Sequence, residues 1–241
     1  MAVKPAEEGS FWDHLEEFRK RIFIMVFTVA ALTAIAFFFS RHITNYVTSS
    51  SPGELVALAP AEAITAHLRL SVTVGIILAS PVLLFQMWRF IAPGLYQRER
   101  KSVISVTIAG TFLFISGAAF AWFVMRKPAL LLFQSFETGN IHGAWSVAAY
   151  IGFIGSFLLI FGSAFQLPLA VLFLTKTGII EPGTLAKYRR HIVVGLLIMA
   201  AILTPPDPLT QVMLALPLYI LFEISLVVAR IASRKAKSVS E

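Results

Sequence analysis

Six long apolar stretches divide this chain of 241 residues, and basic residues collect in alternate segments between them. Four segments, including both ends of the chain, carry sixteen lysines and arginines, whereas the other three carry four. Positively charged loops stay on the cytoplasmic side of a membrane, so we expect six spans with both termini in the cytoplasm. The expected spans are residues 22–39, 70–88, 102–125, 147–175, 192–203 and 209–229.

Composition excludes an ordinary soluble protein. The chain is 57% hydrophobic and 14% charged, which leaves too few polar groups to cover a soluble domain of this size. We therefore expect an all-α integral membrane protein with residues 1–241 in a single polytopic domain. An interfacial helix is expected over about 10–21 and a disordered tail over about 233–241. The net charge of +7 reflects topology and suits anionic lipid headgroups in place of nucleic acid.

The expected spans differ in length. Residues 192–203 would form a helix about 18 Å long, short of the roughly 30 Å hydrocarbon core. The turn TPPDP at 204–208 follows directly, so the fifth and sixth spans should form a short hairpin with a sunken turn. Taller spans beside such a hairpin predict a cupped bundle. Pro168 and Pro217 should bend their helices.

Two carboxylates near the expected cytoplasmic surface are candidate ligand-binding groups. Glu17 lies before the first span and Glu99 in the loop after the second. Each carboxylate accepts two parallel hydrogen bonds from one guanidinium, so together they suit a ligand with two arginines. The spacing equally allows an ordinary ion pair between Glu17 and Arg21, four residues apart on one helix.

Polar residues within or beside the later spans form a second set of candidates, because such groups are costly in lipid. Gln166 could face a cavity, or it could make an interhelical bond or cap a carbonyl freed by Pro168. Glu223 is either functional or a buried carboxylate paired to a cytoplasmic base. Asp207 either belongs to the same set or caps the sixth span before Pro208.

Enzyme chemistry finds no support in the sequence. There is no HExxH metal motif and no glycine-rich phosphate loop. The chain has no cysteine, which excludes thiolate chemistry and cysteine metal sites. The histidines, at positions 14, 42, 67, 142 and 191, fall outside the spans. We therefore expect neither an enzyme nor a cofactor or metal.

Several motifs together resemble one family, TatC, the multispanning core of the twin-arginine (Sec-independent) protein translocase. The resemblance covers nearly the whole chain, in order and at family spacing. The early motif is HLEEFRKR at 14–21. The second block is SP at 80–81, FQMWRFIAPGLY at 85–96 and ER at 99–100. The late block is LTPPD at 203–207, with Gln211 and LFEI at 221–224.

The resemblance implies transport of folded proteins across the bacterial plasma membrane, driven by the proton-motive force. It implies that Glu17 and Glu99 bind twin-arginine signal peptides, and its early motif adds His14, Arg19 and Arg21 to this site. It also implies TatA- and TatB-type single-span partners and a homo-oligomer within a larger complex. The family often has Glu where this chain has Gln166, which cannot titrate.

We expect partner helices to dock on the short fifth span and the concave face beside Gln166. The docking residues expected on the fifth span are Ile192, Leu196, Met199 and Leu203. Two other classes remain open. One is a small-solute transporter or channel lined by Gln166, Glu223 and Asp207. The other is a passive scaffold for membrane proteins, which would bind no signal peptide.

Overall fold

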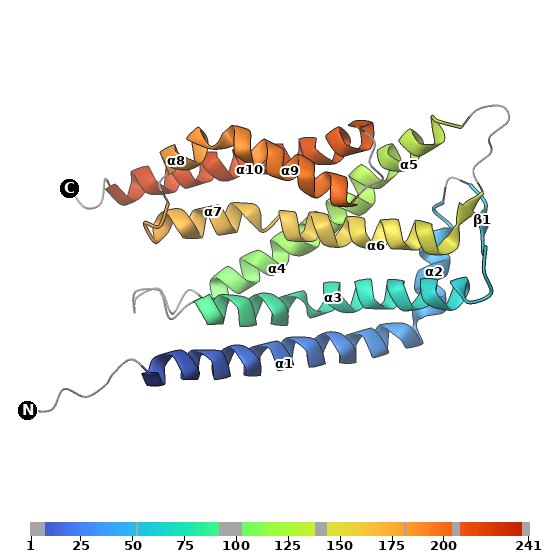
Figure 1. Ribbon diagram of the computed structural model, residues 1–241, viewed down its shortest axis with the longest axis horizontal. Helices are drawn as coiled ribbons and strands as arrows, with labels where there is room; N and C mark the ends of the chain where they lie inside the picture. The colour runs from blue at the N-terminus through green and yellow to red at the C-terminus, as the bar shows by residue number, and fades with distance from the viewer. Residues whose placement is uncertain are drawn as a thin grey trace, which may run out of the picture.

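The computed structural model describes residues 8–237 except 52, 92–102, 138–143, 181 and 204–207. The described chain is almost entirely helical (Figure 1). Its elements are α1 (Glu8–Phe38), α2 (Ser40–Thr48), β1 (Leu55–Val56), α3 (Glu62–Ile91), α4 (Val103–Phe120), the π-helical turn η3 (Ala121–Met125), α5 (Arg126–Gln134), β2 (Trp145–Ser146), α6 (Val147–Ala164), α7 (Leu167–Lys176), α8 (Pro182–Lys187), α9 (Arg189–Leu203) and α10 (Pro208–Lys237).

Five helical stretches within the described residues are long and apolar enough to cross a membrane. They are Leu15–Phe38, Glu62–Ile91, Val103–Gln134, Val147–Lys176 and Gln211–Ile231. The expected fifth span corresponds to α9, which has 15 residues and a length of about 22 Å. That is less than the roughly 30 Å hydrocarbon core, so α9 is not counted among the helices that are long enough to cross a membrane.

The long helices lie side by side with both described ends of the chain at one end of the bundle (Figure 1). We call this the terminal end; α1 begins there, α3 and α7 end there, and α10 ends there. The opposite, distal end carries α2, β1 and β2. The most extensive packing joins α1 with α3, α3 with α4, both α3 and α4 with α6, and α10 with α7 and α9.

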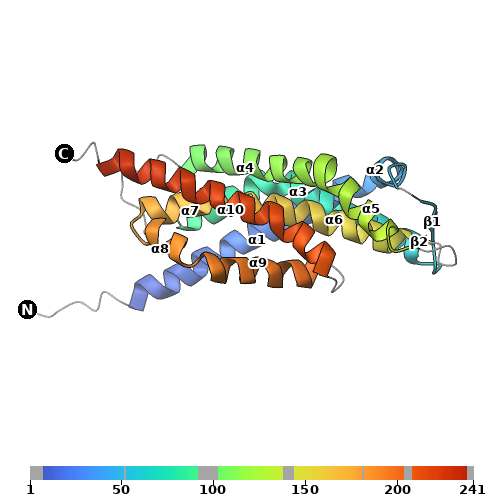
Figure 2. The same cartoon turned by 90° about the horizontal axis from the view of Figure 1, so that it is seen from above.

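The bundle is cupped. In Figure 1 α1 and α9 lie at the two edges of the layer formed by α3, α6 and α7, and Figure 2 shows both of them on one side of that layer and α4 on the other. Figure 1 also shows that α9 ends and α10 begins well short of the distal end reached by α6. The hairpin of α9 and α10 therefore stops below that end, as its length predicts.

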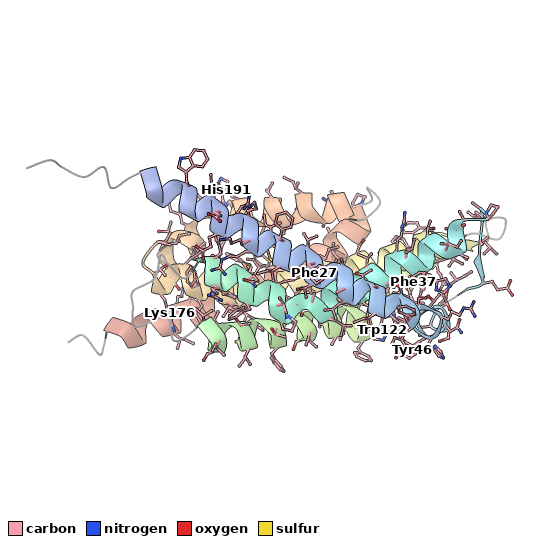
Figure 3. The ribbon with its side chains drawn as sticks, turned by 90° about the horizontal axis from the view of Figure 1, so that it is seen from below. Phe27, Phe37, Tyr46, Trp122, Lys176 and His191 are labelled. Atoms are coloured by element: carbon pink, nitrogen blue, oxygen red, sulfur yellow. The ribbon has the colours of Figure 1, made fainter. Side chains whose placement is uncertain are left out.

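Large apolar side chains cover the outer surface of the helices. Phe27 is 77% and Phe37 43% exposed on α1 (Figure 3), and similar exposure recurs on α4 and α10. Only lipid can accommodate so much apolar surface along helices of this length. The chain is thus a multi-pass membrane protein, as predicted.

One carboxylate ties together the distal end. The Glu62 side chain accepts the Ala148 amide across 3.0 Å and the Ala59 amide across 3.2 Å, with the Ser146 hydroxyl and the Leu58 amide as further donors. These bonds join the start of α3 to the start of α6. Beside them, β1 and β2 pair in parallel, Leu55 opposite Trp145.

The third expected span differs from its prediction. The helix does not end at residue 125 but continues through η3 and α5 to Gln134, so Arg126 and Lys127 lie within it. The fourth span is interrupted at 165–166, just before Pro168. At the ends of the chain, α1 already begins at Glu8 and α10 reaches Lys237, four residues beyond the expected start of the tail; residues 238–241 are outside the described residues.

Candidate functional site

A polar cluster at the terminal end joins α1 to α3. Arg21 donates from Nε to Oε1 of Glu17 across 3.1 Å, and its Nη2 meets the same oxygen. Its Nη1 donates to Oε1 of Gln86 on α3, also across 3.1 Å. Arg21 and Gln86 are each 8% exposed, so the guanidinium is fixed from two sides. This cluster sets the position of the Glu17 carboxylate.

Glu17 itself is partly exposed. Its side chain is 37% exposed, against 9% for that of Arg21. A cationic group can therefore reach the exposed part of the Glu17 side chain while Arg21 stays in place.

The residues around Glu17 are mostly basic and exposed. Arg19 projects from α1, and Lys20 pairs with Glu16 across 2.9 Å in an exposed ion pair. On the side toward α3, the rings of Phe18 and Phe90 lie 5.4 Å apart. These basic side chains would repel a basic ligand unless a carboxylate bound it. Glu17 is therefore the candidate group for binding such a ligand.

The second carboxylate of the expected pair is that of Glu99. Glu99 lies outside the described residues, and so does the side chain of His14. The segment that contains Glu99 joins the end of α3 to the start of α4, and both ends lie at the terminal end (Figure 1). The pairing of Glu17 with Glu99 stays a prediction.

Gln166 forms the interhelical bond that was one of its two predicted roles. It lies at the interruption between α6 and α7, and its Nε2 donates to the carbonyl of Gly110 on α4 across 3.0 Å. Its Oε1 is buried and has no hydrogen-bond partner within the described residues. Gly110 permits this approach, since a Cβ there would lie 3.0 Å from that oxygen.

Glu223 is paired, as one of its predicted roles required. Its Oε2 accepts Arg189 Nη2 across 2.8 Å, and its Oε1 accepts the Tyr219 hydroxyl across 2.8 Å. Arg189 is the first residue of α9, so the pair joins α9 to α10. Further along, Gln211 Nε2 donates to the Leu197 carbonyl across 2.8 Å. Asp207 lies outside the described residues.

The expected docking face on α9 needs a correction. Leu196 is 8% exposed and packs with Leu214 and Phe161 in the core, with Ile192 partly buried beside it. It faces inward because α9 must cover α10. Val194 and Ile198, 54% and 56% exposed, form the outward face. The side chains of Met199 and Leu203 lie outside the described residues.

Sequence reasoning missed two partners, Gln86 for Arg21 and Arg189 for Glu223. Gln86 carried a usable signal, because it is a polar residue within the apolar stretch 70–88 just as Gln166 is within 147–175. Arg189 was counted only as a loop charge. The sequence contains no periodicity that links it to Glu223, since the two lie 34 positions apart.

Comparison with known proteins finds one family over most of the chain. The family model described as Sec-independent protein translocase protein (TatC) matches residues 13–217. The Sec-independent protein translocase protein TatC of Aquifex aeolicus is 36% identical over 236 residues, covering 95% of this chain and 98% of the relative. That of Desulforapulum autotrophicum is 34% identical over 241 residues, covering 98% and 89%.

Solved structures agree with the sequence matches. A crystal structure of the twin-arginine translocase receptor TatC superposes with a TM-score of 0.84 at 35% identity, covering 91% of this chain and 99% of that one. A second, of the same receptor in DDM, gives 0.82 and covers 90% and 99%. The cupped arrangement of α1 to α10 is thus similar to an experimentally determined fold.

Proposed function

This chain belongs to the TatC family of Sec-independent protein translocase proteins, and from that membership we propose that it binds twin-arginine signal peptides at the terminal end of its bundle. Together with TatA- and TatB-type single-span partners it carries folded proteins across the bacterial plasma membrane. The proton-motive force drives this transport, and the chain works as one copy among several in a larger complex.

The observation that carries the proposal is the placement of Glu17. Its carboxylate is fixed by the buried Arg21–Gln86 pair and keeps 37% of its side chain exposed. Fixed donors and acceptors bind a ligand with less loss of conformational freedom than mobile ones. A signal-peptide arginine would meet a carboxylate already oriented, with Glu99 as the proposed second acceptor. The name of the superposed crystal structure, a translocase receptor, supports the same role.

The proposed orientation places the terminal end in the cytoplasm. The ends of α3 and α7, the start of α9 and both described ends of the chain gather there (Figure 1), and they carry Arg89, Lys176, Arg189 and Arg190. Arg41 lies on α2 at the distal end, whereas Arg126 and Lys127 lie within the third spanning helix. This asymmetry follows the positive-inside rule. In this orientation α9 is the short fifth of six spans, and its turn lies in thinned lipid or against a partner.

The channel alternative receives less support from the contacts. Two of the three residues expected to line a polar path are engaged within the protein, Gln166 with Gly110 and Glu223 with Arg189 and Tyr219. A solute path needs polar groups that face water. A passive scaffold gives no reason for an oriented, exposed carboxylate among basic residues.

Crosslinking tests the proposal directly. The chain has no cysteine, so a single cysteine can replace Glu16, which neighbours Glu17 and is exposed. A twin-arginine peptide that carries a thiol-reactive group beside its arginines should crosslink there, whereas a twin-lysine peptide should react far less. The Glu17→Gln, Glu99→Gln double variant should lose binding by about 1–3 kcal/mol for each charge-assisted bond removed. Binding at the wild-type level in that double variant would contradict the proposed site.

A further inference from the structure

A pocket of about 580 Å³ opens at the distal end, lined by residues of α3, α5, β2 and α6. Its walls are mainly aromatic, with Phe133, Trp145, Tyr150 and Phe153, and the guanidinium of Arg69 lies among them. Arg69 is seven positions beyond Glu62, the first residue of α3, so it lies about 10 Å along that helix. Arg69 therefore lies in the distal part of a helix that is about 45 Å long, at a level where headgroups meet the roughly 30 Å hydrocarbon core.

Arg69 has no counter-charge in the described part of the chain. Its side chain makes no hydrogen bond, ion pair or ring contact there. The two acidic groups near the pocket are already engaged: Glu62 by the four donors that close the distal end, and Glu137 by Trp145 Nε1 across 3.4 Å. An arginine near the end of a spanning helix extends to the interface, where it pairs with an opposite charge or contacts a polar group such as a lipid headgroup.

A second arginine adds positive charge behind the same pocket. Arg126 is 8% exposed, and its guanidinium carbon lies 4.0 Å from the centre of the Trp122 ring. Figure 3 shows Trp122 beside Tyr46, and the two rings stack at 5.7 Å. Arg126 also lies against Tyr150, a wall of the pocket, while its Nε and Nη1 have no partner within the described residues. Arg126 does not line the pocket, but its charge lies behind the Tyr150 wall.

We propose that this pocket binds the phosphate of a membrane phospholipid, with Arg69 as the group that recognises it. Guanidinium and phosphate form short, paired hydrogen bonds. Aromatic side chains are favoured at the level where headgroups meet acyl chains, so the ring walls suit the glycerol backbone and the first methylenes. A free anion would gain nothing from such walls, and neither would the carboxylate of a partner protein.

Gly152 leaves space beside the Arg69 guanidinium for the proposed phosphate. A Cβ at that position would lie 3.1 Å from Nη1 of Arg69, which is tight for two non-bonded atoms. A larger side chain at 152 would therefore fill the space beside the guanidinium and leave the charge itself unchanged. This gives a way to block the pocket that is independent of removing the arginine.

Lipid binding can be measured by native mass spectrometry on the full chain in detergent, titrated with phosphatidylglycerol. Arg69→Gln should raise the apparent Kd about tenfold, the effect of losing one charge-assisted contact. Arg41→Gln is the matched control, because Arg41 is an exposed arginine on α2 outside the pocket, and it should bind as the wild type does. A wild-type Kd in Arg69→Gln would overturn the proposal.

Gly152→Leu provides the second test, because it keeps Arg69 and fills the pocket. It should also weaken phosphatidylglycerol binding, and unchanged binding would show that the lipid does not enter this pocket. Inorganic phosphate, added as a competitor at the lipid concentration, should displace little lipid; complete displacement would assign the site to a free anion. None of these results depends on signal-peptide binding, so the lipid site and the proposed function fail or stand separately.

Discussion

Arg21 on α1 donates from Nη1 to Oε1 of Gln86 on α3 across 3.1 Å, and both residues are buried. The same guanidinium holds Glu17. The orientation of the Glu17 carboxylate at the proposed peptide site therefore depends on the side-chain amide of Gln86. That residue lies 69 positions later in the chain, on a different helix.

Replacing Gln86 by alanine should weaken both the fold and the site. A buried donor on Arg21 would lose its acceptor, which costs about 1–3 kcal/mol, and Glu17 would lose its fixed position. Thermal unfolding in detergent and twin-arginine peptide binding measure the two effects. Lys20→Ala, which breaks only an exposed pair with Glu16, should change the unfolding temperature little. Wild-type peptide affinity in Gln86→Ala would show that Arg21 alone orients Glu17.

The ion pair of Arg189 and Glu223 should stabilise the hairpin of α9 and α10. Both groups keep part of their surface exposed, 42% and 29%, so we expect a coupling of about 0.5–1 kcal/mol in a double-mutant cycle. The cycle uses Arg189→Gln and Glu223→Gln, measured by unfolding in detergent. Tyr219→Phe is the third variant, because it removes the other bond to Glu223 and keeps the ion pair. Purely additive effects would mean that the pair contributes no net stability.

Gln166→Ala should reduce transport more than peptide binding. The bond to Gly110 holds α4 at the interruption between α6 and α7, and it lies far along the bundle from Glu17. A hydrogen bond within a membrane contributes about 0.6–2 kcal/mol, so the defect should be partial. Ser163→Ala, an exposed change on α6, is the control. If Gln166→Ala transports cargo at the wild-type rate, this side chain has a structural role only.

Gly117→Ala should be strongly destabilising. A Cβ there would lie 2.4 Å from the carbonyl oxygen of Phe161, so α4 and α6 would have to separate. Overpacking of this kind costs about 1–3 kcal/mol. Gly183→Ala is the matched control, with nothing within 4 Å of its added Cβ, and it should unfold as the wild type does. Equal unfolding temperatures for the two variants would contradict the close contact of α4 and α6.

Partner helices should approach the outward face of α9. Single cysteines at Val194 and Ile198 should crosslink to the span of a TatA- or TatB-type partner, because both side chains are more than half exposed. A cysteine at Leu196 should not, since that position faces the core. Crosslinks are read by mobility shift in membranes that contain both proteins. Equal crosslinking at all three positions would mean that α9 leaves the bundle when the partner binds.

Much of the helical architecture was predictable from hydropathy. The expected spans at 70–88 and 209–229 lie within α3 and α10, because lipid leaves the backbone no alternative to internal hydrogen bonds. The third span is longer than hydropathy predicts, because backbone hydrogen bonding does not stop where the apolar residues stop. Hydropathy falls at Arg126 and Lys127, but helical hydrogen bonding continues through them, and Arg126 is buried against Trp122.

The candidate site was less predictable because it depends on contacts between distant helices. Glu17 and Arg21 lie on one helix at a spacing that indicates their pair, but nothing in the sequence joins Arg21 to Gln86. The orientation of α9 also depends on the core that it covers. Its apolar residues surround the whole helix, so Leu196 and Ile198 could not be told apart until packing placed one inside and one outside.

The Glu62 contacts set an order for biogenesis. Two of the donors, Ser146 of β2 and Ala148 of α6, lie 84 and 86 positions later in the chain. During synthesis α3 therefore enters the membrane well before Ser146 and Ala148 leave the ribosome, and until then one oxygen of Glu62 has only water or lipid headgroups to bind. The distal cap is completed late, when α6 arrives, so a chain stalled before residue 146 would expose an unfinished end to quality-control proteases.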